Sequence, residues 1–261
     1  MYYYVFEQPH TNVDRKVNDK VRMHLTGFGI AGEFCVSSPA RSAEELVDMG
    51  LRKGVGTVGA GGSDYHINRV VNTLKGLERG LHRDIVLGVI PTDKESSLRE
   101  RLRLQNIQEA CEALKYRRFT TVDVGYIEGA SYFLTTAEIH TSRPTVISIK
   151  ADRWESEAKI TDLTIFSDLT FSFFNSQKSK GLMDKWVTWL TNSRSVEDKS
   201  VSLFRARIIR VSGEAILPVT VEGTVVAKTP VVAYKMAKAL KLIVKRDRFT
   251  PMDEDKNKES E

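Results

Sequence analysis

The sequence predicts two parts in the α/β class: an N-terminal α/β domain built on a parallel sheet with helices on both faces, then a mainly antiparallel β-rich, sandwich-like domain. In the first part, strand-like and helix-like patterns alternate, which is typical of a parallel sheet with right-handed crossovers. In the second part, β-branched and aromatic runs follow one another between short turns. We therefore expect domains at 1–119 and 120–248 and a polar, disordered tail at 249–261.

Each apolar run of the first half is followed by a helical pattern. The helix at 13–25 is indicated by apolar side chains every four residues from Val13 to Leu25. The next helix opens on Ser42 and Glu45, whose spacing is that of a capping box worth about 1 kcal/mol. The expected strands are 2–6, 32–38, 55–62 and 84–91, and the expected helices are 13–25, 42–54, 67–80 and 106–118.

The second half is predicted to be mostly strand. A strand, a turn around Glu128 and Gly129 and a second strand are expected over 119–140. One helix, at 180–192, interrupts the strands, and its apolar stripe predicts packing on the core, with a lipid-facing surface as the alternative. The later strands are expected at 145–150, 160–166, 169–174, 201–211, 216–226 and 239–245.

Composition excludes an integral membrane protein that spans with helices. No window approaches about 18 uninterrupted apolar residues, and the first residues do not resemble a signal peptide. We therefore expect a cytoplasmic protein. Cys35 and Cys111 have neither metal-site spacing nor disulfide density, so both are expected to be packed thiols. The net charge of +5 suits an anionic partner, such as nucleotide, a phospholipid surface or nucleic acid, but also an ordinary basic surface.

In open α/β sheets, ligands bind beyond the carboxyl ends of the strands. The segments to consider are therefore the turns after the first, third and fourth strands: Gln8 to Asn12, Gly61 to Tyr65, and Thr92 to Ser97. In the middle turn, two adjacent glycines precede a helical pattern, as in loops that hold phosphate through backbone N–H groups.

Four segments resemble, in order, the diacylglycerol kinase and sphingosine kinase type of lipid kinase, including its bacterial members. They are "GTVGAGGSDYHINRVVNTL", "LGVIP", "VDVGYIEGASYFLTTA", and the late strands "FRARIIRV" with "LPVTVEG". The resemblance covers nearly the whole chain. It implies a nucleotide-binding domain of the NAD kinase and diacylglycerol kinase type, with ATP and Mg²⁺ as cofactors.

The resemblance also implies site residues. Gly61 and Gly62 match the family's Gly-Gly-Asp-Gly-Thr phosphate turn, but four residues, Ser63 to His66, stand where three are expected, and the turn's last glycine is lost. Asp64 keeps an acidic group that can meet Mg²⁺, and Asn68 matches the start of the family's helix. The second loop begins at Thr92 and has no glycine up to Ser97.

Two further residues complete the implied site. In the first loop, where only Pro9 of the family's Asn-Pro-x-Ser-Gly remains, Thr11 can replace a hydroxyl donor. Late in the chain, "VEGT" matches the family's Val-Asp-Gly-Glu, which places Glu222 on the position of the catalytic base. Glutamate carries its carboxylate one methylene, about 1.5 Å, farther than aspartate. An alternative arrangement would place Asp64 on Mg²⁺ and Lys94 on phosphate.

Each residue also has a purely structural interpretation. The glycine pair can form an ordinary turn, Asp64 can cap a helix, and His66 is expected to be a solvated loop residue. Glu222 can be a solvated turn residue. The basic side chains of 99–103 and 115–118 suit a solvated helix face, or contact with anionic lipid.

Three functions remain open. The first is an ATP-dependent lipid kinase that phosphorylates diacylglycerol or a related lipid, which it would meet as a peripheral protein at the bilayer surface. The second is a catalytically reduced member of the same fold that binds nucleotide or lipid as a sensor. NAD kinase is the third, disfavoured by the late β segments. We expect nucleotide and membrane lipid as partners but no nucleic acid, and exposed strands of the second half can support a homodimer.

Overall fold

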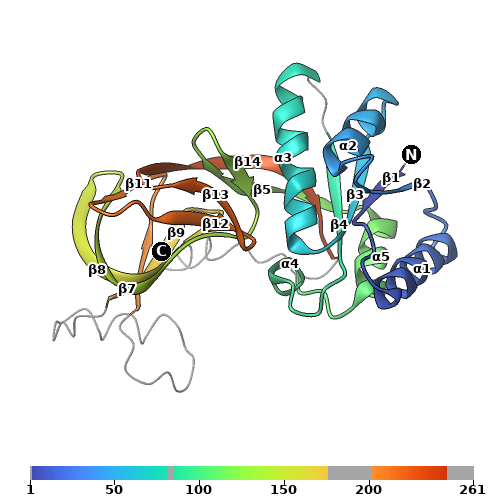
Figure 1. The fold of residues 1–261 in the computed structure, drawn as a ribbon. Helices are drawn as coiled ribbons and strands as arrows, with labels where there is room; N and C mark the ends of the chain where they lie inside the picture. The colour runs from blue at the N-terminus through green and yellow to red at the C-terminus, as the bar shows by residue number, and fades with distance from the viewer. Residues whose placement is uncertain (1, 82–84, 176–200, 246–261) are drawn as a thin grey trace, which may run out of the picture. The chain divides into compact units, whose positions relative to one another are not determined.

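The computed structural model describes residues 2–81, 85–175 and 201–245 (Figure 1). The contacts of these residues form two compact units, one made from the described residues up to 121 together with 241–245, and one made from the described residues of 122–240. The helix expected at 180–192 and the tail expected at 249–261 lie outside the described residues.

The first unit is the predicted α/β part. The structure confirms that strands and helices alternate and that the strands pair in parallel, in the order β2, β1, β3, β4. Its elements are β1 (Tyr2–Phe6), α1 (Asn12–Gly27), β2 (Glu33–Val36), α2 (Ala43–Arg52), β3 (Thr57–Gly62), α3 (Asp64–Leu81), β4 (Val86–Pro91), α4 (Ser97–Arg101) and α5 (Ile107–Tyr116).

This strand order places helices on both faces of the sheet. Right-handed crossovers put α1, between β1 and β2, on one face, and α2 and α3, which lead across to β3 and β4, on the other. In agreement, α2 packs beside α3, and α1 beside α5 (Figure 1). The central strands β3 and β4 are buried along their whole length, as expected for strands covered on both faces.

The helix boundaries follow the capping residues. Ser42 and Glu45 form the predicted capping box of α2, and Thr11 and Asp14 form a second one at α1. The expected apolar face of α1 is only partly right, because Val21 and Leu25 are buried whereas Val13 is 68% exposed. The first turn of α1 therefore extends beyond the core. Residues 97–101, expected in part as loop, form the short helix α4.

The second unit is antiparallel, as predicted. β7 pairs with β8, β8 with β9 and β9 with β10, while β11 lies between β7 and β14. The strands are β5 (Phe119–Ile127), β6 (Ser131–Phe133), β7 (Thr136–Ala151), β8 (Trp154–Phe166), β9 (Thr170–Asn175), β10 (Val201–Arg205), β11 (Ile208–Gly213), β12 (Pro218–Val221), β13 (Thr224–Lys228) and β14 (Val231–Ile243).

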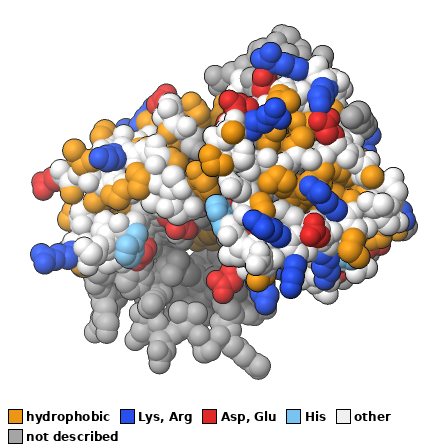
Figure 2. All heavy atoms as spheres, turned by 45° about the vertical axis from the view of Figure 1, so that its right-hand side comes forward, with side chains coloured by type: hydrophobic (Ala, Val, Ile, Leu, Met, Phe, Trp, Pro, Cys, Tyr) orange, Lys and Arg blue, Asp and Glu red, His pale blue; other side chains and the backbone are white. Residues whose placement is uncertain are grey.

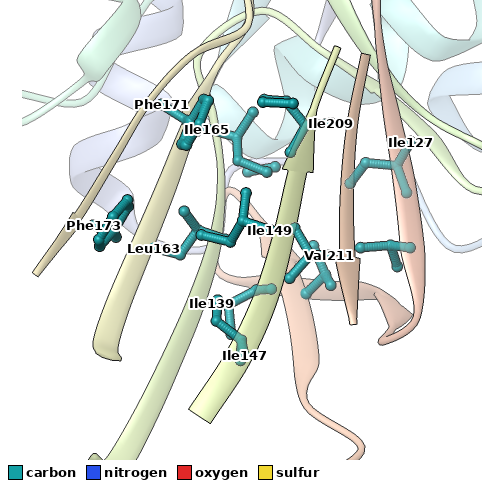
Figure 3. Close-up of a cluster of buried hydrophobic side chains, with 14 of the residues drawn as sticks. Ile127, Ile139, Ile147, Ile149, Leu163, Ile165, Phe171, Phe173, Ile209 and Val211 are labelled. Atoms are coloured by element: carbon teal, nitrogen blue, oxygen red, sulfur yellow. The ribbon is translucent and has the colours of Figure 1, made fainter. Parts of the chain in front are cut away.

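Alternate residues of these strands build one apolar core. Ile147 and Ile149 of β7, Leu163 and Ile165 of β8, and Phe171 of β9 point to the same side of the sheet and are at most 2% exposed (Figure 3). The period of two is that of a sheet with one buried face. This core explains the β-branched and aromatic composition of the second half.

Several predicted strands have different bounds. The expected strand 145–150 is the end of the long strand β7, and the run 216–226 divides into β12 and β13 at Glu222 and Gly223. The run 201–211 divides into β10, which pairs with β9, and β11, which pairs with β7 and β14, and at the break the Asp152 carboxylate accepts the N–H groups of Arg207 and Ile208. The expected strand 239–245 is the end of the long strand β14. Lys241 and Leu242 of β14 pair in parallel with Val86 and Leu87 of β4 and extend the first sheet.

None of the helices described by the structure is both long enough and apolar enough to cross a bilayer. Lys and Arg side chains on the face of the molecule seen in Figure 2 are interspersed with Asp and Glu, so the positive net charge is not gathered into one patch on that face.

Candidate nucleotide site

The carboxyl ends of β1, β3 and β4 meet at one edge of the first sheet and bring together the three predicted loops. The Glu7 N–H donates to the Gly61 carbonyl over 2.8 Å, and the Thr92 N–H donates to the Gly62 carbonyl over 3.0 Å. Main-chain hydrogen bonds therefore hold the loops after β1 and β4 against the end of β3. The predicted residues Gly61, Gly62 and Thr92 lie together at this edge.

The glycines of β3 accommodate aromatic rings of β1. Gly59 is paired with Tyr4 and Gly61 with Phe6, and a Cβ atom at either glycine would overlap the ring of its partner. Gly62 differs because its φ of +149° is one that L-residues rarely adopt, and a Cβ there would lie 2.6 Å from Glu7 Cβ. Packing of β1 thus accounts for Gly61, and backbone conformation accounts for Gly62.

Ser63 is the single residue between β3 and α3, and it is bound by the carboxylate of Glu7. The Ser63 N–H donates to Glu7 Oε2 over 2.6 Å, and the Ser63 hydroxyl donates to Glu7 Oε1 over 3.0 Å. The hydroxyl also accepts the N–H of His66 over 3.3 Å. The first donors at the start of α3 are therefore satisfied within the protein.

Asp64 is the first residue of α3 and links the two loops that follow β3 and β4. Its side chain is buried, with one oxygen accepting the Ser96 hydroxyl and the other accepting the Leu98 N–H over 3.2 Å. Ser96 is also the N-cap of α4, where its hydroxyl oxygen accepts the N–H of Arg99 over 3.0 Å. In place of a second glycine-rich turn, the chain thus has a short helix anchored on Asp64.

Thr11 serves as the N-cap of α1. Its hydroxyl accepts the Asp14 N–H over 3.2 Å, while Asp14 Oδ2 accepts the N–H groups of Thr11 and His10 over 2.8 and 2.9 Å. These hydrogen bonds hold the pKa of Asp14 below its usual range. A carboxylate therefore occupies backbone donors in the first loop as well as at Ser63.

His66 is not the solvated loop residue that the sequence predicted. It lies inside the first turn of α3 with 2% of its surface exposed, and its Nε2 lies 3.3 Å from the Val5 carbonyl. Since a carbonyl only accepts hydrogen bonds, Nε2 carries the proton in the neutral ring. Burial lowers the pKa of His66, and the Val5 carbonyl and the Glu7 carboxylate offset this lowering only in part.

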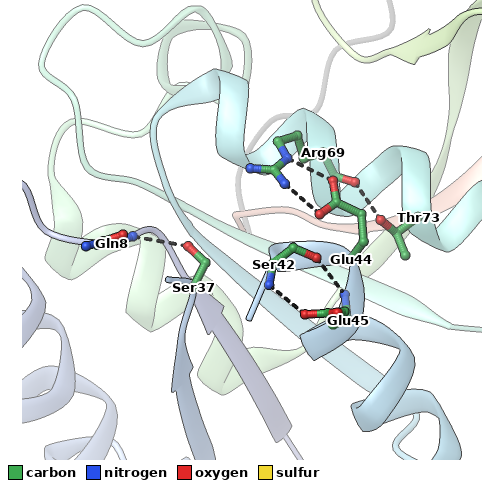
Figure 4. Close-up of polar contacts among 7 residues, drawn as sticks. All are labelled: Gln8, Ser37, Ser42, Glu44, Glu45, Arg69 and Thr73. Atoms are coloured by element: carbon green, nitrogen blue, oxygen red, sulfur yellow. Dashed lines mark hydrogen bonds and ion pairs between the residues drawn. The ribbon is translucent and has the colours of Figure 1, made fainter. Parts of the chain in front are cut away.

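Asn68, also predicted at the nucleotide, is buried in the next turn of α3. Its main-chain carbonyl accepts the side-chain amide of Asn72 over 2.9 Å. The following residue, Arg69, fixes α3 against α2. Its guanidinium makes two hydrogen bonds of 2.8 and 2.6 Å to the Glu44 carboxylate (Figure 4). In Figure 4 the same α2 carries the Ser42 capping box, so both helices are held at their amino-terminal ends.

The edge of the sheet is acidic. Burial raises the pKa of Asp93, and the carboxylates of Glu7, Asp64 and Asp14 raise it further. Basic groups line a surface hollow beyond the second loop, formed by Lys94, Glu95, Ser96, Ser97, Arg99, Glu100, Arg103, Leu104 and Gln105. Of these, Arg99 is engaged by the Pro91 carbonyl over 2.9 Å, while Lys94 is exposed.

Mg²⁺ fits this edge only as part of a nucleotide complex. Within the described ranges, no three His, Cys, Asp or Glu side chains gather as a metal site. Both oxygens of Asp64 already accept hydrogen bonds, although each ionised oxygen has a second lone pair. Mg²⁺ in kinases is held by one or two carboxylates together with substrate phosphates, and Asp64 can supply one such carboxylate.

Glu222 belongs to the second unit, in the turn between β12 and β13. It lies in the left-handed region at φ +48°, followed by Gly223 at φ +73°. Positive φ at both residues is what a two-residue hairpin turn between antiparallel strands requires. The Glu222 carboxylate accepts the hydroxyl of Thr135, which is 5% exposed.

Glu7, Asp14 and Ser96 were missed as site residues by the sequence analysis. Thr11 and Asp14 have capping-box spacing, so that pair carried a readable signal. Glu7 and Ser96 had none, because their partners lie 56 and 32 residues away in the chain. Only the pairing of β3 with β1 and β4 brings these groups together.

Comparison with known proteins agrees with this architecture. Residues 7–127 match the family model of the diacylglycerol kinase catalytic domain. No curated protein matches the sequence.

Solved structures extend the likeness to nearly the whole chain. A candidate diacylglycerol kinase from Bacillus anthracis str. Sterne is 14% identical, with a TM-score of 0.73, over 93% of this chain and 97% of that one. A diacylglycerol kinase from the same organism is 16% identical, with a TM-score of 0.68, over 93% and 96%. An NAD kinase from Archaeoglobus fulgidus in complex with ATP is 13% identical, with a TM-score of 0.59, over 95% and 96%. Residues 7–127 therefore match the diacylglycerol kinase catalytic domain, and nearly the whole chain has the fold of these solved structures.

Proposed function

We propose that the protein is an ATP-dependent lipid kinase, which transfers the γ-phosphate of ATP to a hydroxyl of diacylglycerol or a related lipid. The observation that carries the proposal is the gathering of the family's phosphate-loop positions at one sheet edge, within the segment that matches the diacylglycerol kinase catalytic domain. Ligands bind at this edge in open α/β sheets. The lipid would be met at the bilayer surface by a peripheral, cytoplasmic protein, alone or as a homodimer.

The nucleotide phosphates would lie over Gly61, Gly62 and Ser63, at the start of α3. The 18-residue helix α3 places its positive dipole end at this point, and the Ser63 N–H that Glu7 now binds is a donor that a phosphate could use. Thr11 and Thr92 would contact the nucleotide from the neighbouring loops, and Asn68 would support the site from within α3. Bound with the nucleotide, Mg²⁺ would neutralise phosphate charge beside Asp64.

Glu222 would act as the base. In the transfer, the lipid hydroxyl oxygen forms a bond to the γ-phosphorus, the bond from that phosphorus to the bridging oxygen breaks, and ADP leaves. The hydroxyl proton passes to the Glu222 carboxylate. The Thr135 hydroxyl, donating to one oxygen of Glu222, would fix the orientation of the carboxylate.

A lipid phosphorylation assay tests the proposal. Purified wild type, Glu222→Gln and the control Glu214→Gln, whose side chain is exposed, would be supplied with labelled ATP, Mg²⁺ and diacylglycerol in mixed micelles. Gln keeps the size of the side chain and the oxygen that accepts from Thr135, but it cannot take a proton. Removing a general base costs about 10²–10⁴-fold in rate, so we expect a loss of at least 100-fold for Glu222→Gln and less than twofold for the control.

The second candidate, a catalytically reduced member that binds nucleotide or lipid as a sensor, is favoured by one specific observation. The donors of Ser63 and Thr11, which a phosphate would use, are bound to carboxylates of the protein itself. If the wild type binds Mg-ATP but forms no labelled lipid product, the result supports the sensor function. Full activity of Glu222→Gln would refute the assignment of the base.

A further inference from the structure

Glu7 binds the start of α3 as a phosphate would. Its two carboxylate oxygens accept the N–H and the hydroxyl of Ser63, over 2.6 and 3.0 Å. Its own N–H is anchored on the Gly61 carbonyl over 2.8 Å. At Gly62 a Cβ atom would lie 2.6 Å from Glu7 Cβ, so only glycine allows the side chain to pack this closely over the turn.

The same donors are the ones that the proposed nucleotide site needs. Backbone N–H groups at a helix start bind anions, and a carboxylate and a phosphate oxygen compete for the same N–H. Resting on the proposed function, we infer that Glu7 is a built-in competitor of the nucleotide phosphate, which binds at Ser63 only when the Glu7 carboxylate has moved away. Glu7 therefore sets the affinity of the site for nucleotide.

Neighbouring charges do not favour the phosphate over Glu7. The carboxylates of Asp64 and Asp93 face the same edge, and Glu7 lies close enough to interact with Asp93. The two nearest guanidinium groups are engaged elsewhere, Arg69 by Glu44 and Arg99 by the Pro91 carbonyl. Burial lowers the pKa of His66, which disfavours its charged form. A phosphate entering the turn thus meets like charge, whereas an uncharged residue at position 7 would remove the competing anion.

The competition lowers the apparent affinity in proportion to the fraction of molecules whose turn is open. Glu7→Ala frees both Ser63 donors. Glu7→Gln removes the charge but keeps an oxygen that can accept from Ser63. Asp93→Asn is the matched control, because it removes a negative charge from the same edge without touching the bonds between Glu7 and Ser63. We therefore expect anion affinity to rise from wild type to Glu7→Gln to Glu7→Ala.

The test is a titration of the full chain with inorganic pyrophosphate, followed through the Ser63 amide in ¹H–¹⁵N NMR spectra. Glu7→Ala should bind with a Kd at least tenfold lower than wild type, and Asp93→Asn should stay within threefold of wild type. Amide signals of the β-rich unit report that each variant is folded, and Glu7→Gln keeps the side-chain volume if the alanine variant is not folded. If the Ser63 amide signal shifts equally in wild type and both Glu7 variants, or shifts in none of them, the inference is wrong.

This readout is independent of kinase activity. If the Glu7 variants gain pyrophosphate binding but neither they nor the wild type phosphorylate lipid, the role of Glu7 as a competitor is supported and the proposed kinase function is wrong. If the wild type phosphorylates lipid and the Glu7 variants bind pyrophosphate no better, the kinase function stands and the competitor is wrong.

Discussion

At the scale of single residues, the glycines that suggested a phosphate loop have two different roles. Gly61 lies within β3 against the ring of Phe6, a cross-strand pairing of glycine with an aromatic residue that stabilises sheets. Gly62, with its positive φ, ends the strand and leaves room for Glu7. The pair therefore serves the packing of β1 as well as the turn that leads into α3.

Gly61→Ala should destabilise the fold. The added methyl group must displace the buried Phe6 ring, and overpacking of this kind costs about 1–3 kcal/mol of unfolding free energy. The control Gly76→Ala, in α3 with nothing within 4 Å of its Cβ position, should stabilise by about 0.5–1 kcal/mol. Urea unfolding measures both. A Gly61→Ala protein as stable as wild type, but impaired in Mg-ATP binding, would instead assign the glycine to the ligand.

His66 should make the fold less stable as the pH falls. Burial lowers the pKa of His66 in the folded protein. Below the unfolded pKa of about 6.5, the unfolded chain therefore binds a proton that the folded protein does not. Stability is therefore fully present above about pH 6.5 and is lost as the pH falls toward the lower folded pKa. Glu7 and the Val5 carbonyl act against this shift, and Arg69 acts with it.

Replacing His66 should reduce this pH dependence. Urea unfolding at pH 7.5 and 5.5 should show a smaller loss of stability for His66→Gln, whose amide can still donate to the Val5 carbonyl, than for wild type. His10→Gln, at an exposed position, is the control and should keep the wild-type dependence. Equal losses in wild type and His66→Gln would show that other groups cause the effect.

At the scale of elements, α4 is held in place by the start of α3. Ser96 caps α4 and donates to the buried Asp64 carboxylate. Ser96→Ala removes the cap, worth about 1 kcal/mol, and leaves a buried carboxylate oxygen with one partner fewer, which costs about 1–3 kcal/mol. The neighbouring Ser97→Ala, at an exposed position, should be near neutral. Chemical denaturation of the two variants measures these costs. Equal stabilities would contradict a stabilising contact between Ser96 and Asp64.

Elements with local signals could be predicted from the sequence. The capping box of Ser42 marked the start of α2, and the buried runs of β3 and β4 marked parallel strands. The break between β10 and β11 could not be predicted, because the two strands pair with different partners and the Asp152 carboxylate at the break comes from 55 residues earlier. The basic side chains of 99–103 suited a helix face, but the anchor of α4 on Asp64 could not be predicted, because it exists only after β3 and β4 pair.

At the scale of the whole molecule, the fold class and the position of the candidate site followed from the order of elements. Alternating strands and helices fix which strand ends share an edge, so Gly61, Gly62 and Thr92 could be brought together in advance. The contact of Glu7 with this edge could not be predicted, because Glu7 looks like an ordinary solvated acid in the sequence. It accepts the Ser63 N–H only in the assembled sheet.

We propose that this edge binds nucleotide against the competition of Glu7. The most direct test is thermal unfolding of the full chain, wild type and Glu7→Gln, with and without millimolar Mg-ATP. A ligand at 100 times its Kd adds about 2.7 kcal/mol to stability. We predict that Mg-ATP raises the Tm of both proteins, and that of Glu7→Gln by several degrees more. No rise in either protein, or equal rises, would contradict the account.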